Sequence, residues 1–303
     1  MNDDKRLGYA AGITAYAAWG VIPAYFKLLI PVAPDAIVAN RIAWSLPLLA
    51  LALFAFRRWE RFGAVLRSPK LIMALVASAL LIAINWLLYV YAINSGHILA
   101  GSLGYYLNPL ANILLGRFVL HERLERRQWI AVGIAAAGVA VLAAGALTTL
   151  WISLGLCLSF ASYGIIRKLV PVDSVTGLSV ETLLLYPFAI GWLWFAGPLL
   201  GTLTATPKLM WLLAGTGLIS TVPLLLFTEA ARRLPYSTVG MLQFIAPTLQ
   251  FLLAVAFYGE ALTAAHMIAF AAIWTALALY VSALLGARRQ RRLAEGTVEA
   301  QEA

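Results

Sequence analysis

A segment near the middle of the chain recurs near its end, and this repeat restricts the folds that the sequence can adopt. When Asn108 is laid against Ala246, Pro109 meets Pro247 and Glu122 meets Glu260 without a gap. Four arginines of the first copy have apolar counterparts in the second: Arg117, Arg123, Arg126 and Arg127 meet Val255, Ala261, Ala264 and Ala265. Copies that are alike in pattern and opposite in charge predict two repeats inserted into a membrane in opposite directions.

Composition indicates an integral membrane protein. Hydrophobic residues make up 62% of the 303 residues and charged residues 12%, whereas a soluble domain carries about 25% charged residues. The formal net charge of +9 does not indicate a nucleic-acid partner, because the arginines cluster in short connectors between apolar segments. Cys157 is the single cysteine, which excludes a disulfide framework and a cysteine-based metal site.

Ten apolar segments are long enough to cross a bilayer. A helix needs about 20 residues to span the hydrocarbon, and only helices satisfy every backbone polar group of an open chain there. The sequence therefore predicts an all-α integral membrane fold with ten transmembrane helices, over residues 7–29, 35–56, 71–93, 98–120, 128–147, 150–169, 175–197, 209–230, 236–258 and 264–285.

The basic residues predict how these helices are oriented. If the N-terminus is cytoplasmic, all but three of the 22 Lys and Arg residues fall on the cytoplasmic side, the exceptions being Lys27, Arg41 and Lys208. This asymmetry follows the positive-inside rule and places both termini in the cytoplasm. An odd number of helices in each half requires the second half to be inverted. We expect a first repeat over residues 1–147, a second, inverted repeat over 148–287, and a basic then acidic cytoplasmic tail over 288–303 with a disordered end.

Ionisable residues inside apolar segments are costly and mark candidate functional sites. Arg41 is about 9 Å below the outer surface at 1.5 Å per residue. It either snorkels to the interface or faces a central cavity, where it would attract an anionic group. Glu181 is equally deep from the cytoplasmic side, where burial favours the protonated form that a proton-coupling carboxylate requires. We expect Arg41 and Glu181 to be related across the midplane without forming an ion pair.

Polar residues recur at matching places in the fourth and ninth segments. Tyr105, Asn108 and Asn112 share one helical face. Gln243 and Gln250 occupy the repeat-equivalent positions of Tyr105 and Asn112. These residues either line a substrate cavity or form hydrogen bonds between helices, and their mirrored placement favours the cavity.

Two prolines lie in the same segments. Pro109 and Pro247 are expected to break their helices and free backbone carbonyls at matching depths. Interrupted helices at corresponding places in two halves point to a transporter's binding site. Asn85 and Tyr89, one turn apart in the third segment, and Trp19, midway along the first, complete the predicted substrate-binding residues.

Motifs for enzymatic chemistry are missing from the sequence. His97, His121 and His266 lie in separate connectors without ligand spacing, and neither a Walker A sequence nor a G-x-S-x-G or H-E-x-x-H motif occurs. We therefore expect no enzyme, no metal site, no cofactor and no ATP-driven transport by this chain alone. Glu122, which lies among arginines, is expected to cap a helix or anchor a loop.

Several sequence stretches resemble one known group of proteins. Both halves end in an x-P-x-x…E-x-L pattern, and further cues lie in residues 19–27, 40–45, 85–94, 101–109 and 243–248. Together they resemble the RarD subgroup of the EamA permeases, in the drug/metabolite transporter superfamily, over nearly the whole chain. The resemblance implies two inverted five-helix EamA repeats, a bacterial inner-membrane location and export.

These features together predict a secondary transporter, or permease, that moves a small amphipathic metabolite or drug by alternating access between inverted repeats. The expected partners are a small-molecule substrate, the lipid bilayer and, if transport is coupled, protons; we expect no nucleic acid, and a monomer or weak dimer. One alternative is a non-transporting membrane scaffold, which has no need of mirrored prolines and amides. The other is a lipid-modifying membrane enzyme, which would need acids, histidines or metal ligands clustered at an interface.

Overall fold

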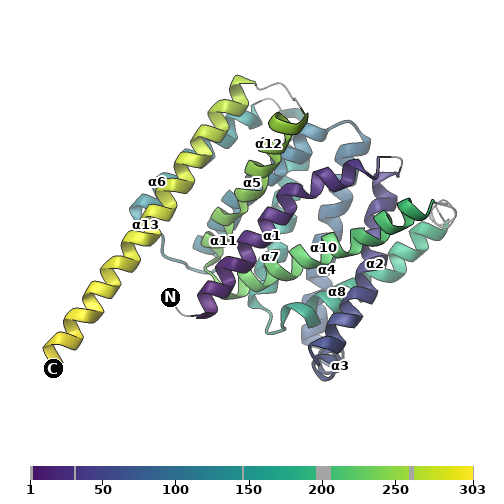
Figure 1. Cartoon of the computed structure of the whole chain (residues 1–303), viewed down its shortest axis with the longest axis horizontal. Coiled ribbons are helices and arrows are strands. Elements are labelled where there is room, and N and C mark those ends of the chain that lie inside the picture. Colours follow the sequence, from purple (N-terminus) through teal and green to yellow (C-terminus); the bar gives the residue numbers. More distant parts are fainter. Residues whose placement is uncertain (1–2, 31, 145–146, 196–205, 259–262, 303) are drawn as a thin grey trace.

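The computed structural model describes residues 3–30, 32–144, 147–195, 206–258 and 263–302, and in these ranges the chain is helical without a strand. The helices, labelled in Figure 1, are α1 (Asp3–Lys27), α2 (Pro34–Ala55), α3 (Trp59–Leu66), α4 (Pro69–Asn94), α5 (Ile98–Phe118), α6 (Arg126–Ala143), the 3-10 turn η1 (Leu147–Thr149), α7 (Leu150–Leu169), α8 (Ser174–Phe195), α10 (Pro207–Arg233), α11 (Tyr236–Gln243), α12 (Ile245–Tyr258) and α13 (Ala264–Glu302).

Helices cover the ten predicted segments, with one segment divided between α11 and α12. Within the described residues, seven helical stretches are long and apolar enough to cross a membrane, so the chain is a multi-pass membrane protein. Those seven do not include α1, α5 or the pair α11 and α12. Helix α11 has 8 residues and α12 has 14, and each is too short to span alone. The full count of ten spans stays a prediction.

Two parts of the helical pattern differ from the predictions. Helix α3 lies in the connector between the second and third predicted segments, where no helix was predicted, and its Val65 is buried beside Leu75, Val170 and Val180. The expectation of a disordered end was wrong, because α13 continues to Glu302. The tail is rich in Ala, Arg, Gln and Glu, which are strong helix formers.

Local sequence explains where several helices begin. Proline occupies the first turn of α2, α4 and α10, where its missing N–H needs no partner and its fixed φ suits a helix. Helix α6 begins with a capping box in which the backbone N–H of Glu125 donates to Gln128 Oε1 at 2.8 Å. These signals fix the helix starts independently of the membrane.

Helix packing recurs when the two predicted halves are exchanged. Helix α1 of the first half corresponds to α7 of the second, α4 to α10, and α5 to the pair α11 and α12. Helix α1 packs on α10, and the corresponding pair α7 and α4 also pack together. In the same way, α5 packs on α7, and α11 and α12 pack on α1. Three further pairs join counterparts directly: α2 with α8, α5 with α11, and α6 with α13. Figure 1 shows α6 and α13 side by side at one edge of the bundle. This pattern supports a two-fold relation between the halves, while the domain boundaries and the inversion stay predictions.

Candidate functional site

Arg41 of α2 is the centre of a group of side chains from several helices. Its Nε donates a hydrogen bond to Ser220 Oγ of α10 at 2.6 Å. Its guanidinium carbon lies 5.7 Å from the ring centroid of Phe26 and 5.1 Å from that of Trp86. These contacts direct the side chain into the bundle, toward α1, α4 and α10. The ion pairs found in the described residues do not include Arg41, so its neighbours there leave its charge uncompensated.

Two predicted tyrosines join Arg41. The rings of Tyr89 on α4 and Tyr105 on α5 meet edge to face with centroids 5.6 Å apart, and both side chains are close enough to Arg41 to interact electrostatically. Three predicted site residues thus come together, with three others that the sequence prediction omitted. The Arg41 cluster consists of Phe26, Arg41, Trp86, Tyr89, Tyr105 and Ser220.

A close approach of two helices places Arg41 opposite Ser220. A Cβ atom added to Gly217 of α10 would lie 2.6 Å from the backbone oxygen of Trp44 on α2, so only glycine allows this crossing. Arg41 is about one turn before Trp44, and Ser220 about one turn after Gly217. The crossing therefore brings these two side chains within hydrogen-bonding reach.

Glu181 of α8 belongs to a second, separate group of polar side chains. The residue is 1% exposed. Its Oε1 accepts a hydrogen bond from Ser78 Oγ at 2.5 Å, and its Oε2 accepts one from Tyr163 Oη at 3.3 Å. Arg167 Nε lies 3.5 Å from Oε1, and the Arg167 side chain is fully buried. Glu181 therefore has a charged partner, and that partner is not Arg41.

Arg167 has a buried partner that the sequence did not reveal. It lies in the last turn of α7 and pairs with Glu181. The sequence prediction counted it, with Lys168, among the basic residues of the cytoplasmic side, and that orientation stays a prediction. Its place within the predicted segment 150–169 was the available signal for burial, but the adjacent Lys168 made the two resemble a flanking basic pair.

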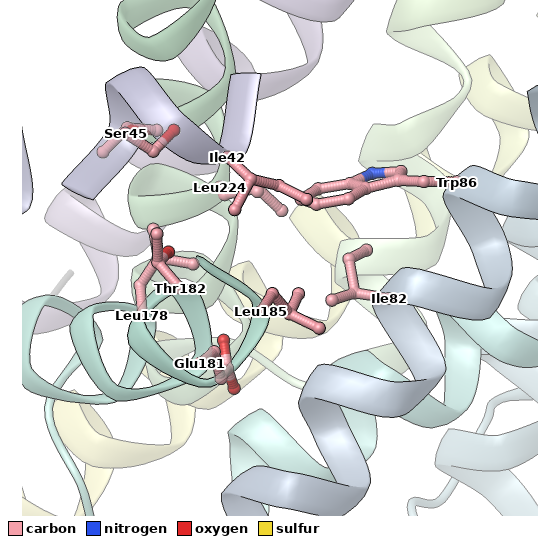
Figure 2. Close-up of a pocket in the computed structure, with 10 residues that line it drawn as sticks. Ile42, Ser45, Ile82, Trp86, Leu178, Glu181, Thr182, Leu185 and Leu224 are labelled. Carbon is pink, nitrogen blue, oxygen red and sulfur yellow. The ribbon is translucent and has the colours of Figure 1, made fainter. Parts of the chain in front are cut away.

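A small, partly enclosed cavity lies between Trp86 and Glu181. Its volume is about 20 Å³, which is room for about one water molecule. Figure 2 shows the Trp86 indole and the Glu181 carboxylate on opposite sides of it, with Ile82 and Leu185 between them. The Thr221 hydroxyl also lines this cavity and is buried without a hydrogen-bond partner in the described residues. Ligand pockets commonly measure about 300–1000 Å³, so the side chains here are closed around a space much smaller than a substrate.

Four other predicted binding residues form hydrogen bonds between helices. Asn85 Nδ2 donates to the Leu156 carbonyl at 2.8 Å, which ties α4 to α7. Asn112 Nδ2 donates to Gln243 Oε1 at 2.7 Å, which ties α5 to α11. Gln250 Nε2 donates to the Trp19 carbonyl at 3.1 Å. The structure thus uses these amides in the way that the helix-packing alternative described.

The two remaining predicted residues, Trp19 and Asn108, are not among the described contacts of Arg41. Trp19 packs in an aromatic group with Tyr16, Phe160 and Phe227, at centroid distances of 5.5, 5.8 and 5.8 Å. Asn108 is fully buried, and both polar atoms of its amide are without a partner in the described residues. Trp19 therefore acts as a packing residue here, whereas Asn108 keeps an unused hydrogen-bonding capacity.

The two prolines affect their helices differently. Helix α11 ends at Gln243 and α12 begins at Ile245, because Pro247 cannot donate the backbone hydrogen bond that the Gln243 carbonyl would accept. Helix α5 runs without interruption past Pro109, so the expected break there is absent. Gly240 lies against Pro109, and a Cβ on it would be 2.7 Å from the Pro109 oxygen.

Glu122 caps the beginning of α11. Its carboxylate accepts hydrogen bonds from the backbone N–H groups of Tyr236 at 2.5 Å and Ser237 at 2.9 Å, and from Ser237 Oγ at 2.6 Å. A negative charge is favourable at this end of a helix, and the contact is the cap or anchor that the sequence predicted. Its repeat counterpart, Glu260, lies outside the described residues.

Comparison with known proteins gives the family. The model of the EamA-like transporter family matches residues 6–144. An uncharacterized transporter of Pseudomonas aeruginosa is 46% identical over 280 residues, which are 91% of this chain and 93% of that protein. Protein RarD of Salmonella typhi is 44% identical over 297 residues, which are 94% of this chain and 98% of that protein.

A solved structure shares the fold. It is named "Crystal structure of protein" and aligns with a TM-score of 0.69 at 20% identity, covering 90% of this chain and 96% of that one. The relative from Pseudomonas aeruginosa is named a transporter, and the described residues include several helices able to span a membrane. The chain therefore belongs to the EamA-like transporter family and is a RarD-like permease of the drug/metabolite transporter superfamily.

Proposed function

We propose that the chain is a secondary transporter that exports a small amphipathic metabolite or drug with an acidic group, which Arg41 binds. The observation that carries this proposal is the environment of Arg41, whose neighbours in the described residues are aromatic rings and hydroxyls, without a carboxylate. A cation inside the membrane is costly. A substrate anion compensates the charge only while it is bound, which is a property suited to transport.

Transport proceeds by alternating access between the two halves. The recurrence of packing pairs on exchange of the halves supports a two-fold arrangement of this kind. The interruption between α11 and α12 supplies a joint at which α12 can tilt relative to α11. The Arg41 cluster draws on α1, α2, α4, α5 and α10, so motion between the halves changes its shape.

Proton coupling at Glu181 is the less supported part of the predicted mechanism. Protonation of Glu181 would leave the buried Arg167 guanidinium, 3.5 Å away, without a charged partner, which is unfavourable. Coupling at Glu181 therefore requires Arg167 to find another acceptor during the cycle. A flux assay at several pH values tests this: coupling at Glu181 predicts that Glu181→Gln abolishes the pH dependence, and an unchanged dependence removes Glu181 from the mechanism.

The main experiment is flux of organic acids through the purified chain in liposomes. The panel consists of small acids and their uncharged amides, so that charge varies while size is nearly constant. We expect acids to be carried and Arg41→Gln to reduce their flux at least tenfold. Lys208→Gln is the matched control, since it removes a positive charge from the same predicted side at an exposed position. Equal flux of acids through wild type and Arg41→Gln would contradict the role of Arg41. Absence of flux for every compound would favour the scaffold alternative.

A further inference from the structure

We propose that the indole of Trp86 is a movable partition that closes the Arg41 cluster, and that an aromatic monocarboxylate displaces it by taking its place against the Arg41 guanidinium. The inference rests on the proposed function, because it names the ligand class and the closing residue of the same site. In this view Trp86 selects the ligand by shape, because the ligand must fit into the place of the indole.

Trp86 contacts both polar regions of the protein interior. Its ring centroid lies 5.1 Å from the Arg41 guanidinium carbon, and its side chain also lines the small cavity that Glu181 faces. Among the residues that line this cavity, Trp86 is the one with a described contact to the Arg41 guanidinium. In Figure 2 the indole extends across the cavity from α4 toward Ile42. Its displacement would join the cavity to the Arg41 cluster.

The indole of Trp86 is held by fewer polar contacts than the side chains of Tyr163 and Tyr236. In the described residues, Trp86 has packing contacts and the contact with Arg41, and no hydrogen bond of its indole nitrogen is found. Tyr236, in contrast, donates a hydrogen bond to the Ala161 carbonyl at 2.7 Å, and Tyr163 donates one to Glu181. A cation–π contact is weak enough to be exchanged for a ligand.

The chemistry around Trp86 indicates what could replace it. A carboxylate can form paired charge-assisted hydrogen bonds with a guanidinium, and Arg41 has no such partner in the described residues. A planar ring suits the apolar cavity wall formed by Ile42, Ile82, Leu178, Leu185 and Leu224. These two requirements together define an aromatic carboxylate.

The far side of the cavity restricts the ligand further. Glu181 lines it and would repel a second negative charge on the ring, so the ligand carries one carboxylate. Thr221 is 4% exposed and lines the same cavity, and its hydroxyl is buried without a partner in the described residues. It is therefore free to bond a hydroxyl or carbonyl substituent on the ring.

The test uses the full chain in lipid nanodiscs with three probes: benzoate, its uncharged analogue benzamide, and terephthalate, which has a second carboxylate opposite the first. Binding is measured by calorimetry. Displacement is measured by fluorine NMR of protein labelled with 5-fluorotryptophan, in which loss of one signal in Trp86→Phe identifies Trp86. We expect benzoate to bind and to shift the Trp86 signal, whereas benzamide and terephthalate do neither.

Two variants separate displacement from simple binding. Trp86→Ala removes the group that competes with the ligand, so benzoate should bind about fivefold more tightly. This factor corresponds to the loss of a cation–π contact of about 1 kcal/mol, since about 1.4 kcal/mol changes an affinity tenfold. The larger 2-naphthoate should then bind as well. Trp211→Ala is the control, because Trp211 lies on α10 with 79% of its surface exposed, and it should leave both affinities unchanged.

The outcomes distinguish this inference from the proposed function. Benzoate binding with an unmoved Trp86 signal and an unchanged affinity in Trp86→Ala would overturn the partition. Arg41-dependent flux of aliphatic acids without benzoate binding would overturn the aromatic ligand class and leave transport intact. Benzoate binding with displacement of Trp86, but without flux of any acid, would support the partition and overturn the transport proposal.

Discussion

Removal of one partner of the Arg167–Glu181 pair should strongly destabilise the protein. The two side chains are 0% and 2% exposed, so bulk water has little access to either charge. At 3.5 Å and an effective dielectric constant of about 20, two unit charges attract each other by about 5 kcal/mol. Buried ion pairs that lose one partner cost about 3–5 kcal/mol. We therefore expect Glu181→Gln, which is nearly isosteric and can still accept from Ser78, to lower the free energy of unfolding by that amount.

A double-mutant cycle checks the reasoning. Arg167→Met should also cost about 3–5 kcal/mol, because it leaves the Glu181 charge buried alone. The double variant Arg167→Met/Glu181→Leu removes both charges and should be less destabilised than either single variant, since apolar residues of similar volume often replace a buried ion pair without loss. The assay is reversible unfolding in mixed detergent micelles, followed by circular dichroism. A cost below about 1 kcal/mol for Glu181→Gln, or additive losses in the double variant, would refute a tightly coupled buried pair.

Three smaller predictions concern the helix contacts. Glu122→Ala should cost about 1–2 kcal/mol, the usual value of a helix cap, and should accelerate amide hydrogen exchange at the start of α11; unchanged exchange would contradict the cap. Gly240→Ala should destabilise the protein, because the new Cβ would lie 2.7 Å from the Pro109 oxygen. The control Gly133→Ala places its Cβ in open space and should be neutral or stabilising in the same unfolding assay. Equal effects of the two substitutions would be evidence against a tight α5–α11 crossing. Asn112→Leu should leave the Gln243 amide oxygen buried without its donor and lower the free energy of unfolding by about 1–3 kcal/mol in the same assay. A much smaller decrease would contradict the importance of this hydrogen bond, because it would mean that Gln243 finds another donor.

The sequence predicted helix positions well because membrane helices are set by local properties. Apolar length decides whether a segment can cross the bilayer, and prolines mark several helix starts. The effect of the two prolines was predicted less well, because both were expected to break their helices. Pro247 does interrupt its segment near Phe244, whereas Pro109 leaves α5 continuous. Proline alone does not decide whether a membrane helix breaks, because neighbouring helices and local adjustments can satisfy the carbonyl that it frees.

The candidate site was predicted only in part, because it depends on contacts between distant parts of the chain. Arg41 and its hydrogen-bond partner Ser220 are 179 residues apart, and no local pattern links them. Depth in a segment identified Arg41 and Glu181, since charge inside a membrane is rare. Depth did not reveal which face of each helix meets which neighbour. Asn85, Asn112 and Gln243 were expected to line a cavity, and in the structure they form hydrogen bonds between helices; their contact with a substrate stays a prediction.

The cap on α11 has a consequence for how the chain can be divided. Glu122 belongs to the first half of the sequence. Its carboxylate accepts hydrogen bonds from the first backbone N–H groups of α11, which belongs to the second half. Gly116 makes room for this carboxylate, since a Cβ there would lie 2.9 Å from Glu122 Oε2. If the gene were split after residue 147, the second polypeptide alone would lack Glu122, and the first backbone N–H groups of α11 would lose their hydrogen-bond acceptor. The second fragment would then depend on the first, because Glu122 would have to come from the other polypeptide to cap α11.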